Sequence, residues 1–401
     1  MRILIISQYF YPENFRINDL CKGLKEQGHK VSVLTAKPNY PNGVFFQGYS
    51  FLNKSLDSYN GIKIYRSPII PRGNGSGIRL FINYISFVIF GIIRILTINE
   101  KFDRVLVYAP SPITVGYIGA FAAFKFRAKS YLWVHDLWPE SVKDAGGINN
   151  KFILYLIDLM TKTIYSFYKT ILVQSPYFKK YLMKQSVKES KIVYYPYYAE
   201  NFYNIKTPKK DIKTLFGNGT NIVFAGNIGV AQSFDTIIDA ALILKDQISD
   251  FKFIIIGDGR DKKRVKKKIL KLSLSNHFKF LGSYLPEKMP DFFACADALL
   301  VSLKNTNIFS MTIPGKLQSY LACGRPIIGS LSGIGADIIN ESKSGYNAEA
   351  ENPKALADCI LNICKLSDEE KKDLGMNGRA YYEKEFEREL LINKLNKILN
   401  Q

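Results

Sequence analysis

The sequence predicts an α/β protein with two Rossmann-like, doubly wound domains that face each other across a cleft. Three observations indicate this fold class: apolar strand-like runs alternate with helical segments in both halves, a polar stretch separates the halves, and glycine turns follow several of the runs. Strands that alternate with helices form parallel sheets, and such sheets bind ligands beyond the carboxyl ends of their strands. The 401 residues suffice for two or three domains, each with its own core.

Apolar runs in the first half predict a parallel sheet with helical connections. The expected strands are Arg2–Gln8, Lys30–Ala36, Ile62–Ser67, Val105–Ala109, Ser130–His135, Thr170–Ser175 and Lys191–Pro196. Helices are expected up to about Gln27 and near 113–126 and 151–168. The stretch Lys37–Gly48 is too rich in Pro, Asn and Gly for regular structure.

The polar stretch Tyr198–Gly219 predicts a linker, after which the same alternation restarts. The expected strands are Asn221–Gly226, Phe251–Gly257, Phe278–Gly282, Ala298–Leu303 and Pro326–Ser330, with helices at Phe234–Leu244, up to Leu272, near 287–295 and from Pro314. We therefore expect a first Rossmann-like domain at 1–200, a second one at 215–380 and a last helix at 381–401 that packs back on the first domain.

The stretch Arg79–Ile98 is the most apolar in the chain. Its charge-free core, Leu80–Ile93, is shorter than the roughly 20 residues that span a bilayer. A buried or interfacial helix is therefore favoured over a membrane span.

The formal net charge of +20 restricts the kinds of partner. Nucleic acid, an anionic membrane surface or phosphorylated substrates would each account for it, and the aromatic content of 13% favours a surface beside a membrane. The five cysteines form no CxxC pair, which argues against a disulfide framework and against zinc. Because the chain enters a strand at once, we expect no signal peptide and a cytoplasmic location.

An acid-free stretch in the second half predicts a phosphate site. Between Asp297 and Asp337 the chain has no Asp or Glu, but it carries Lys304 and Lys316. The helix that starts at Pro314 would present backbone N–H groups and a positive dipole end, which suit a diphosphate. A plain strand–helix–strand unit with a chance gap in acidic residues is the alternative.

Two further glycine turns follow strands in this half. They are FAGNIG at Phe224–Gly229 and IIIGDGR at Ile254–Arg260. Glycines allow a phosphate or sugar to approach the backbone closely. Neither turn is GxGxxG, so a nicotinamide site is poorly supported, and ordinary strand–helix turns remain the alternative.

The pair His135–Asp136 is the sharpest feature of the first half. It follows an apolar strand-like run, so the histidine lies where sites form in α/β sheets. A histidine there can donate a hydrogen bond to a substrate hydroxyl, with the neighbouring acid fixing its tautomer. A structural histidine is the alternative. No DxD pair and no ligand-spaced cluster occurs, so we expect no metal and no cofactor.

Several motifs taken together resemble family 4 glycosyltransferases of the two-Rossmann-domain (GT-B) type. They are QYFYPENFRINDL, LTAKPNYPNG, VHDLWPESV, FAGNIGVAQSFDTIIDAA, IIGDG and IPGKLQSYLACGRPII. The bacterial branch that builds O-antigen, capsule or colanic-type polysaccharides, and that transfers N-acetylfucosamine-like sugars, is the most similar. The resemblance implies that His135 contacts the transferred sugar and that Gly226–Gly229 holds the nucleotide sugar. It also implies that the domain at 1–200 is the acceptor side and the domain at 215–380 the nucleotide-sugar side.

The sequence departs from the family pattern at four positions. Where most members have an Arg and a Lys after the glycine turn, this chain has Asn227 and Gln232. The two family glutamates before ACG are replaced by Met311 and Ser319. Lys316 is the nearest substitute for the missing cations.

The resemblance implies a retaining, metal-independent transferase that moves a sugar from a UDP-sugar to a lipid-linked saccharide at the inner face of the cytoplasmic membrane, without nucleic acid. Alternatives are a UDP-sugar epimerase of the same fold and a basic nucleic-acid-binding protein. The expected catalytic residues are His135 and Asp136, and the expected binding residues are Arg16, Gly226, Asn227, Gly229, Gln232, Gly257, Asp258, Lys304, Thr312, Gly315, Lys316 and Ser319.

Overall fold

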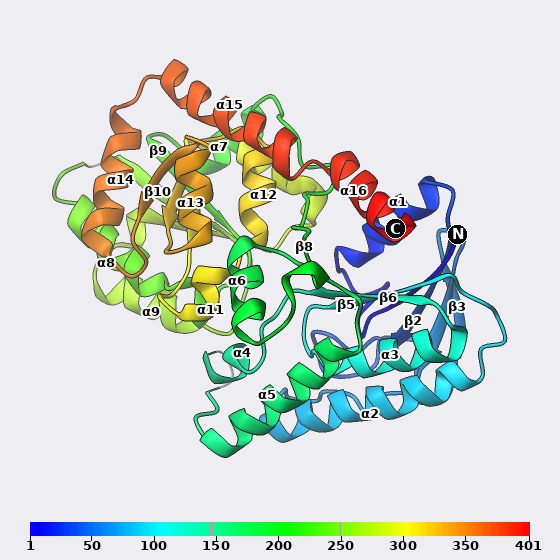
Figure 1. Cartoon of the computed structure of the whole chain (residues 1–401). Helices are drawn as coiled ribbons and strands as arrows, with labels where there is room; N and C mark the ends of the chain where they lie inside the picture. The colour runs from blue at the N-terminus through cyan, green and yellow to red at the C-terminus, as the bar shows by residue number, and fades with distance from the viewer. Residues whose placement is uncertain (145–146, 249) are drawn as a thin grey trace. The chain divides into compact units, whose positions relative to one another are not determined.

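The computed structural model describes residues 1–144, 147–248 and 250–401 and divides the chain into two compact units. The first unit contains Met1–Tyr195 together with Ile392–Gln401, and the second contains Pro196–Leu391 (Figure 1).

Within the described residues, the first unit is built on an eight-stranded sheet in the order β3-β4-β2-β1-β5-β6-β7-β8. The strands are β1 (Arg2–Ile6), β2 (Lys30–Ala36), β3 (Leu56–Tyr59), β4 (Ile62–Ser67), β5 (Arg104–Ala109), β6 (Lys129–Val134), β7 (Thr170–Val173) and β8 (Ile192–Tyr194). Neighbouring strands pair in parallel, except that β3 runs antiparallel to β4. The strand order reverses between β1 and β5. A ligand is therefore expected at the carboxyl ends of β1, β2, β5 and β6.

Helices cover both faces of this sheet. They are α1 (Ile17–Glu26), α2 (Gly77–Leu96), α3 (Val115–Phe126), α4 (Glu140–Asp144), α5 (Lys151–Ser166) and α6 (Pro176–Lys184). Helix α3 packs on β5 and β6 and lies between α2 and α5, while α1 lies on the opposite face (Figure 1). The outer helices α2 and α5 therefore form one surface of the first unit.

The last ten residues complete the first unit from the far end of the chain. They belong to α16 (Arg388–Asn400), whose Leu395 and Leu399 are fully buried. The guanidinium of Arg104 donates a hydrogen bond to the carbonyl of Leu399, and Gln27 donates one to the side chain of Asn393. The first unit is thus made from both ends of the chain.

The second unit has a six-stranded sheet in the order β11-β10-β9-β12-β13-β14, and the strand pairs among its described residues are parallel. The strands are β9 (Thr220–Ala225), β10 (Phe251–Ile256), β11 (Phe278–Gly282), β12 (Ala298–Ser302), β13 (Ile327–Ser330) and β14 (Gly345–Ala348). The helices are α7 (Lys210–Phe216), α8 (Phe234–Leu244), α9 (Lys262–Lys271), α10 (Met289–Ala294), α11 (Asn307–Met311), α12 (Gly315–Ala322), α13 (Ile334–Glu341), α14 (Pro353–Lys365) and α15 (Asp368–Glu385). Its core packs the apolar faces of α8 and α14 against the middle of the sheet.

Two parallel sheets flanked by helices confirm the predicted fold class. Several of the described elements were not predicted, namely β3, β14, α4, α6, α7, α11 and α13, and two of them show why. The stretch expected as a linker contains α7, whose Ile212 and Phe216 are buried one helical turn apart. The edge strand β3 has an alternating, half-exposed pattern and so lacks the apolar run that marks the other strands. Both are short elements whose apolar residues are few.

Candidate functional site

His135 follows β6 directly and lies at the carboxyl edge of the first sheet. Its backbone N–H donates to the carbonyl of Ala109 at 3.1 Å, and its own carbonyl accepts from the side chain of Gln174 at 2.8 Å. The imidazole is 8% exposed and packs on the rings of Trp133 and Tyr108, with centroid distances of 4.2 and 4.7 Å. The ring is therefore held in a fixed orientation.

The surroundings keep His135 neutral. Burial, and then the positive charge of Arg16, hold the pKa of His135 well below its ordinary value. Arg16 stands at the start of α1, so the structure brings these two predicted residues close enough to interact. A neutral imidazole offers one N–H donor and one acceptor to a substrate hydroxyl.

Asp136 has a different set of contacts from the one expected. Its carboxylate accepts a hydrogen bond from the hydroxyl of Ser141 and another, at 3.3 Å, from the indole of Trp138. Burial raises its pKa above the ordinary value, and these hydrogen bonds oppose the shift. The carboxylate therefore anchors the loop between β6 and α4.

In the second unit, two glycine turns lie against each other at the carboxyl ends of β9 and β10. Gly226 and Gly257 have φ angles of +136° and +141°, which favour glycine. A Cβ atom on Gly257 would lie 1.9 Å from the carbonyl oxygen of Gly226, and one on Gly226 would lie 2.8 Å from Cε of Lys316. Only glycine fits at these two positions, because the two turns pack directly on each other and the first packs on Lys316.

Lys316 reaches from the first turn of α12 to these glycine turns. Its Nζ lies 2.6 Å from Oε1 of Gln232 and 3.6 Å from the centroid of the Phe224 ring. The lysine is half-buried, and burial lowers its pKa to about 7. Lys316 and Gln232 were predicted separately, and the structure brings them together.

The other predicted residues of this unit lie on the same loops or behind them. The backbone N–H of Lys304 donates to the carbonyl of Ala231 at 2.9 Å, which ties the loop after β12 to the turn after β9. The carboxylate of Asp258 is paired with Lys262 at 2.9 Å, and its side chain is 64% exposed. The remaining positions are Asn227 and Gly229 in the turn after β9, Thr312 before α12, Gly315 as the first residue of α12, and Ser319, which is buried inside that helix.

Sequence reasoning missed two aromatic residues that build this site. The ring of Phe224, the fifth residue of β9, lies under the ammonium of Lys316. The hydroxyl of Tyr320 accepts a hydrogen bond from the backbone N–H of Ala225 at 3.1 Å and so fixes α12 to the end of β9. Both residues lie inside the quoted motifs, but only the pairing of β9 with α12 gives them these roles.

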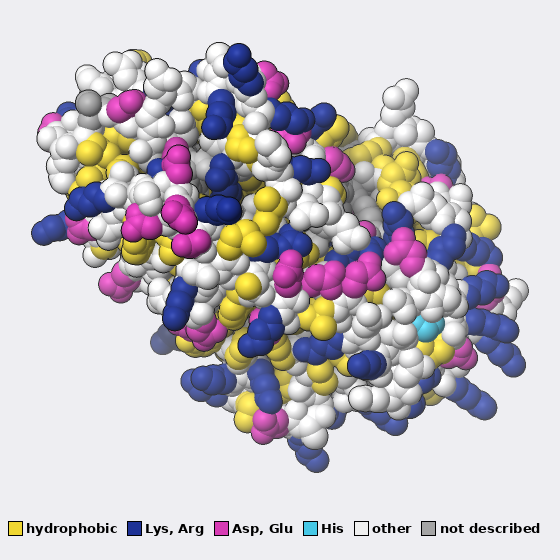
Figure 2. All heavy atoms as spheres, turned by 90° about the horizontal axis from the view of Figure 1, so that it is seen from above, with side chains coloured by type: hydrophobic (Ala, Val, Ile, Leu, Met, Phe, Trp, Pro, Cys, Tyr) yellow, Lys and Arg dark blue, Asp and Glu magenta, His cyan; other side chains and the backbone are white. Residues whose placement is uncertain are grey.

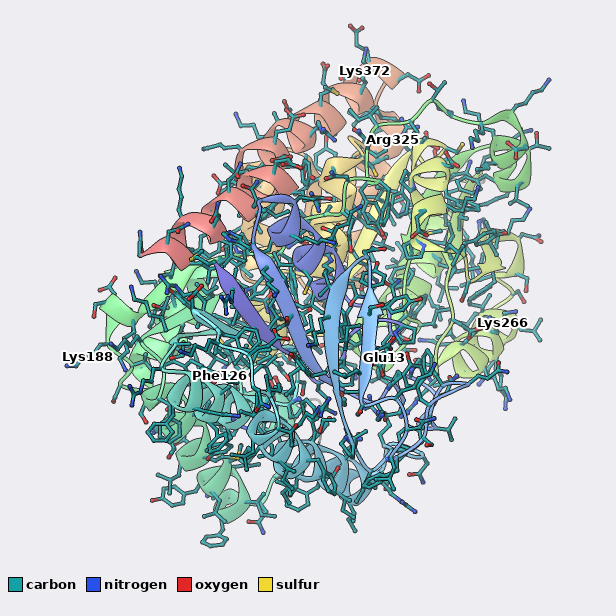
Figure 3. All side chains as sticks on the ribbon, turned by 90° about the vertical axis from the view of Figure 1, so that its right-hand side faces the viewer. Glu13, Phe126, Lys188, Lys266, Arg325 and Lys372 are labelled. Carbon is teal, nitrogen blue, oxygen red and sulfur yellow. The ribbon has the colours of Figure 1, made fainter. Side chains whose placement is uncertain are left out.

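Glu13 is a third residue that the sequence did not single out. It is 2% exposed and lies in the loop after β1, beside the strands of the first sheet (Figure 3). Its Oε1 accepts hydrogen bonds from the backbone N–H groups of Asn39 and Tyr40, both at 2.8 Å. Burial raises the pKa of Glu13 to about 7, although these hydrogen bonds oppose the shift. One carboxyl group thereby joins the two loops that follow β1 and β2.

A pocket of about 400 Å³ lies elsewhere in the first unit. Its lining includes Phe124, Arg127, Lys129 and Lys169, at the amino ends of β6 and β7. It is therefore at the sheet edge opposite to His135. No group of three His, Cys, Asp or Glu side chains with a metal-binding arrangement occurs among the described residues.

Comparisons with known proteins match the two halves of the chain to two families. Residues 15–196 match the family described as Glycosyltransferase Family 4, and residues 206–381 match the family described as glycosyl transferases group 1.

Two relatives are named as bacterial glycosyltransferases. WbjE of Pseudomonas aeruginosa, named a probable glycosyltransferase, is 30% identical over 59% of this chain and 60% of its own length. WcaI of Escherichia coli K12, whose name assigns it provisionally to colanic acid biosynthesis, is 23% identical over 81% of this chain and 82% of its own. The match thus spans three fifths of the first relative and four fifths of the second.

Solved structures share the fold over the whole chain. Sucrose-phosphate synthase from Thermosynechococcus elongatus has a TM-score of 0.77 at 17% identity, covering 100% of this chain and 98% of that one. HepE of Anabaena, in complex with UDP and glucose, has a TM-score of 0.70 at 15% identity and covers 100% and 99%.

Proposed function

We propose that the protein transfers a sugar from a UDP-sugar to a lipid-linked saccharide during the biosynthesis of a capsule or O-antigen polysaccharide. Its two halves match a family 4 glycosyltransferase domain and a group 1 glycosyltransferase domain. The position of the Lys316 ammonium over Phe224 and beside Gly226, at the first glycine turn, is the observation that carries this proposal. WcaI supports the polysaccharide pathway, and HepE, of the same fold, binds UDP.

The diphosphate of the donor would lie at the end of β9. Phosphate oxygens need cations and N–H donors, which Lys316 and the backbone of the glycine turns provide. Gln232 holds the lysine in position before the donor arrives. The cation that relatives carry in the loop after β9 would thus be supplied here by α12.

The proposed reaction is retaining and needs no carboxylate nucleophile. The bond between sugar C1 and the diphosphate oxygen breaks, a bond from C1 to the acceptor oxygen forms on the same face, and the acceptor proton passes to the leaving phosphate. The transition state is cationic at the sugar and anionic at UDP, so stabilising the leaving group is the main electrostatic task. Lys316 is the group assigned to it.

His135 would position the transferred sugar, for which we propose an N-acetylated deoxyhexose such as N-acetylfucosamine. Its fixed, neutral ring can donate to one sugar hydroxyl without attracting a second anion. We therefore assign the transferred sugar to His135 and the diphosphate to Lys316, each within its own unit.

The two alternatives from the sequence have less support. An epimerase of this fold needs acidic residues around the sugar ring, and the chain has no Asp or Glu between Asp297 and Asp337. A nucleic-acid-binding protein would gather its positive charge in a stripe. On the face drawn in Figure 2, Lys and Arg side chains are instead scattered, with Asp and Glu side chains among them.

We also propose that the protein works as a peripheral protein at the inner face of the cytoplasmic membrane, through the first unit. Among the described residues, α2 alone is long and apolar enough to cross a bilayer, with 28% of its most apolar window buried. The helix is longer than the apolar core taken from the sequence, so length does not exclude a span. Its burial pattern favours the sheet surface, because Phe87 and Ile95 pack fully into the core.

The outer faces of α2 and α5 would touch the lipid. The exposed apolar residues are Ile78, Phe81, Ile82, Ile89, Ile93 and Leu96 on α2, and Phe152, Ile153, Tyr155, Leu156 and Leu159 on α5. In both helices they recur at spacings of three, four or seven residues, which puts them on one stripe. Such stripes bury well in the headgroup region, and nearby Lys and Arg side chains add attraction to anionic lipids.

A screen of nucleotide sugars tests the proposed transfer. The purified protein is heated with UDP, UDP-sugars, GDP and dTDP, and UDP release is then followed with membranes that carry lipid-linked saccharides. We expect the uridine compounds alone to raise the melting temperature, and UDP release to require both donor and acceptor. A shift with GDP or dTDP but not UDP would reject the proposed donor, and no shift with any nucleotide would reject the transferase itself.

A further inference from the structure

A buried lysine in the first unit lies outside the site described above. Lys37 follows β2, at the carboxyl edge of the sheet, and is 1% exposed. Its backbone is in place, because its N–H donates to the carbonyl of Ser67 at 3.1 Å and its carbonyl accepts from Asn39 at 3.0 Å. Its side-chain Nζ has no hydrogen-bond partner among the residues that the structure describes.

The charges around Lys37 are mostly of the same sign. The nearest are the cations of Arg66, Arg94 and Lys54, against the carboxylate of Asp57. Burial, and then Arg66, lower the pKa of Lys37 to about 8. A buried ammonium without a partner is costly for a folded protein unless a ligand compensates it.

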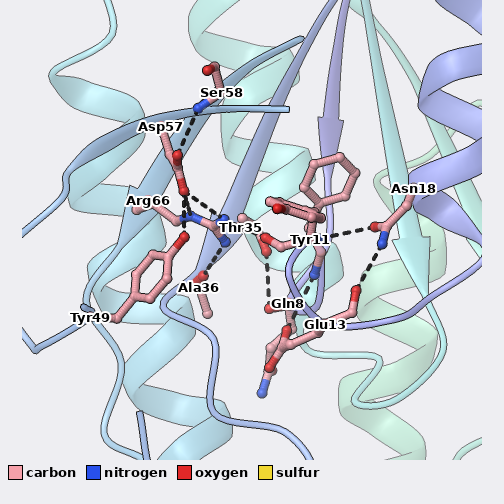
Figure 4. A network of polar contacts seen from close by, with 11 residues as sticks. Gln8, Tyr11, Glu13, Asn18, Thr35, Ala36, Tyr49, Asp57, Ser58 and Arg66 are labelled. Atoms are coloured by element: carbon pink, nitrogen blue, oxygen red, sulfur yellow. Dashed lines mark hydrogen bonds and ion pairs between the residues drawn. The ribbon is translucent and has the colours of Figure 1, made fainter. Parts of the chain in front are cut away.

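Asp57 is not available to Lys37, because other groups already occupy it (Figure 4). Its Oδ2 accepts from the hydroxyl of Tyr49 at 2.6 Å and from the guanidinium of Arg66 at 3.0 Å. Its Oδ1 accepts from the backbone of Ser58 at 2.9 Å. The remaining donors of Arg66 go to the carbonyls of Ala36 and Tyr11.

Arg94, near the end of α2, also has a buried N–H donor without a hydrogen-bond partner among the described residues. Its terminal nitrogens donate to the carbonyl of Ser55 and to the hydroxyl of Thr97, but its Nε is buried without a partner in the described structure. The carbonyl of Ser55 that holds Arg94 also accepts the backbone N–H of Arg66 at 2.9 Å, and Lys37 is bonded to Ser67, the next residue of β4, so both donors lie at the same end of β4. Two buried donors from different elements thus share one electropositive corner, and the exposed Lys54 stands beside it.

We infer that this corner, formed by Lys37 and Arg94 between the ends of β2 and α2, binds a phosphate group. A phosphate has several acceptor oxygens and up to two charges, which matches unpaired donors from two directions and an excess of positive charge. The site is separate from the proposed diphosphate site at Lys316, which lies in the second unit.

The surroundings indicate how a phosphate would arrive. Ile93 and Leu96, which flank Arg94 on α2, are 50% and 57% exposed. A lipid phosphate lies at such a boundary between an apolar surface and a charged one. A free phosphate group would have the same contacts with Lys37 and Arg94, so the experiment must separate the two sources.

Calorimetry with inorganic phosphate tests the site, with UDP present at saturation to keep phosphate out of the proposed donor site. Lys37→Met removes the charge at nearly constant length, and Lys63→Met removes an exposed lysine of β4 as the matched control. We expect Lys37→Met to weaken phosphate binding at least about tenfold, as for the loss of a hydrogen bond to a charged group, and Lys63→Met to bind like the wild type. Heat from UDP itself reports separately on the proposed function.

A second arm measures sedimentation with vesicles of phosphatidylglycerol. Loss of vesicle binding in Lys37→Met, beyond that in Lys63→Met, identifies the ligand as a lipid phosphate, whereas loss of inorganic phosphate binding alone identifies a free one. Wild-type protein that binds neither probe, or Lys37→Met protein that binds both like the wild type, overturns the inference. Arg94→Gln is measured in parallel, so that misfolding of one variant still leaves a test.

Discussion

Lys316 is the residue on which the proposed diphosphate site depends, because its ammonium lies beside Gly226 of the first glycine turn and is bonded to Gln232. Lys316→Ala should weaken UDP binding by about 1.5–3 kcal/mol, the usual range for hydrogen bonds to charged groups. Calorimetry measures the change, with Lys263→Ala, an exposed lysine of α9, as the control. Equal UDP affinity in the Lys316 variant and the wild type would remove this residue from the site.

The pKa of Lys316 adds a pH dependence to the same site. Because burial lowers this pKa to about 7, the ammonium is largely protonated below pH 7 and increasingly neutral above it. UDP affinity should therefore fall as the pH rises from 7 to 9, by up to about tenfold per unit. Lys316→Arg, which stays charged, should show a flat profile over this range if it binds UDP. Parallel pH profiles for the two proteins would show that the titration of Lys316 does not control UDP affinity.

His135 combines a structural and a proposed functional role, since its ring is buried against Trp133 and Tyr108. Truncation to alanine would leave a cavity, so His135→Gln is the better variant. We expect its turnover to fall at least about a hundredfold, the lower range for a positioned polar group, with UDP affinity near that of the wild type. If turnover and melting temperature instead fall together with UDP affinity, the histidine is structural only.

Glu13 gives a prediction about stability. Its pKa in the folded protein, about 7, lies above the ordinary value of 4.5, so the folded state binds the proton more tightly than the unfolded state. The stabilisation from this proton is complete below pH 4.5 and is lost as the pH rises to 7, which amounts to about 3 kcal/mol. Glu13→Gln cannot titrate and should lack this loss. Urea unfolding of both proteins from pH 4.5 to 8 measures the difference, and identical pH slopes would contradict it.

Among the elements, α2 shows most clearly what the sequence alone can and cannot predict. The run Arg79–Ile98 predicts an apolar helix, and the structure has one at Gly77–Leu96. Which residues face the sheet depends on how the helix packs: Phe87 is fully buried, whereas Ile89 is 52% exposed. A variant that changed both residues would therefore damage the core and the surface together.

The membrane contact is best tested on the exposed stripe of α2 alone. Ile89→Asp with Ile93→Asp should weaken sedimentation with anionic vesicles at least about tenfold, because both side chains lose their place in the lipid. Leu270→Asp, at a still more exposed apolar position on α9 in the second unit, should leave binding unchanged. Undiminished binding of the double variant would exclude this stripe as the contact.

At the scale of the molecule, the sequence predicted what local pattern determines. Strands that are largely buried on both faces, such as Lys30–Ala36 and Ile62–Ser67, have the bounds that the sequence predicts, because apolar runs bounded by turns have few other interpretations. The positions of the glycine turns were equally accessible, since they depend on residue type. The contact of Lys316 with Phe224, and the burial of Lys37 beneath its own loop, depend on which elements pack together. Which elements pack together cannot be deduced from a single sequence.

The contribution of the chain end to the first unit can be measured by truncation. Removing Ile392–Gln401 takes away Leu395 and Leu399 and exposes the surface of the first unit on which they pack. The burial of each leucine contributes about 1.5–3 kcal/mol to the stability of that unit. Hydrogen exchange should therefore speed up across the first sheet while the second sheet keeps its protection. Removing Gln401 alone, which is exposed, should change neither. Equal loss of protection in both sheets would contradict the assignment of these residues to the first unit.

A unit made from both ends of one chain also sets an order of assembly during translation. The first eight strands leave the ribosome early, but the residues that cover them are synthesised after the whole of the second unit. At 5–20 residues per second, that interval lasts roughly ten to forty seconds. Throughout it, the nascent first sheet lacks the leucines of α16, whereas the second unit has its whole sequence as soon as Leu391 is added. The half of the protein that is synthesised first is therefore the half that matures last.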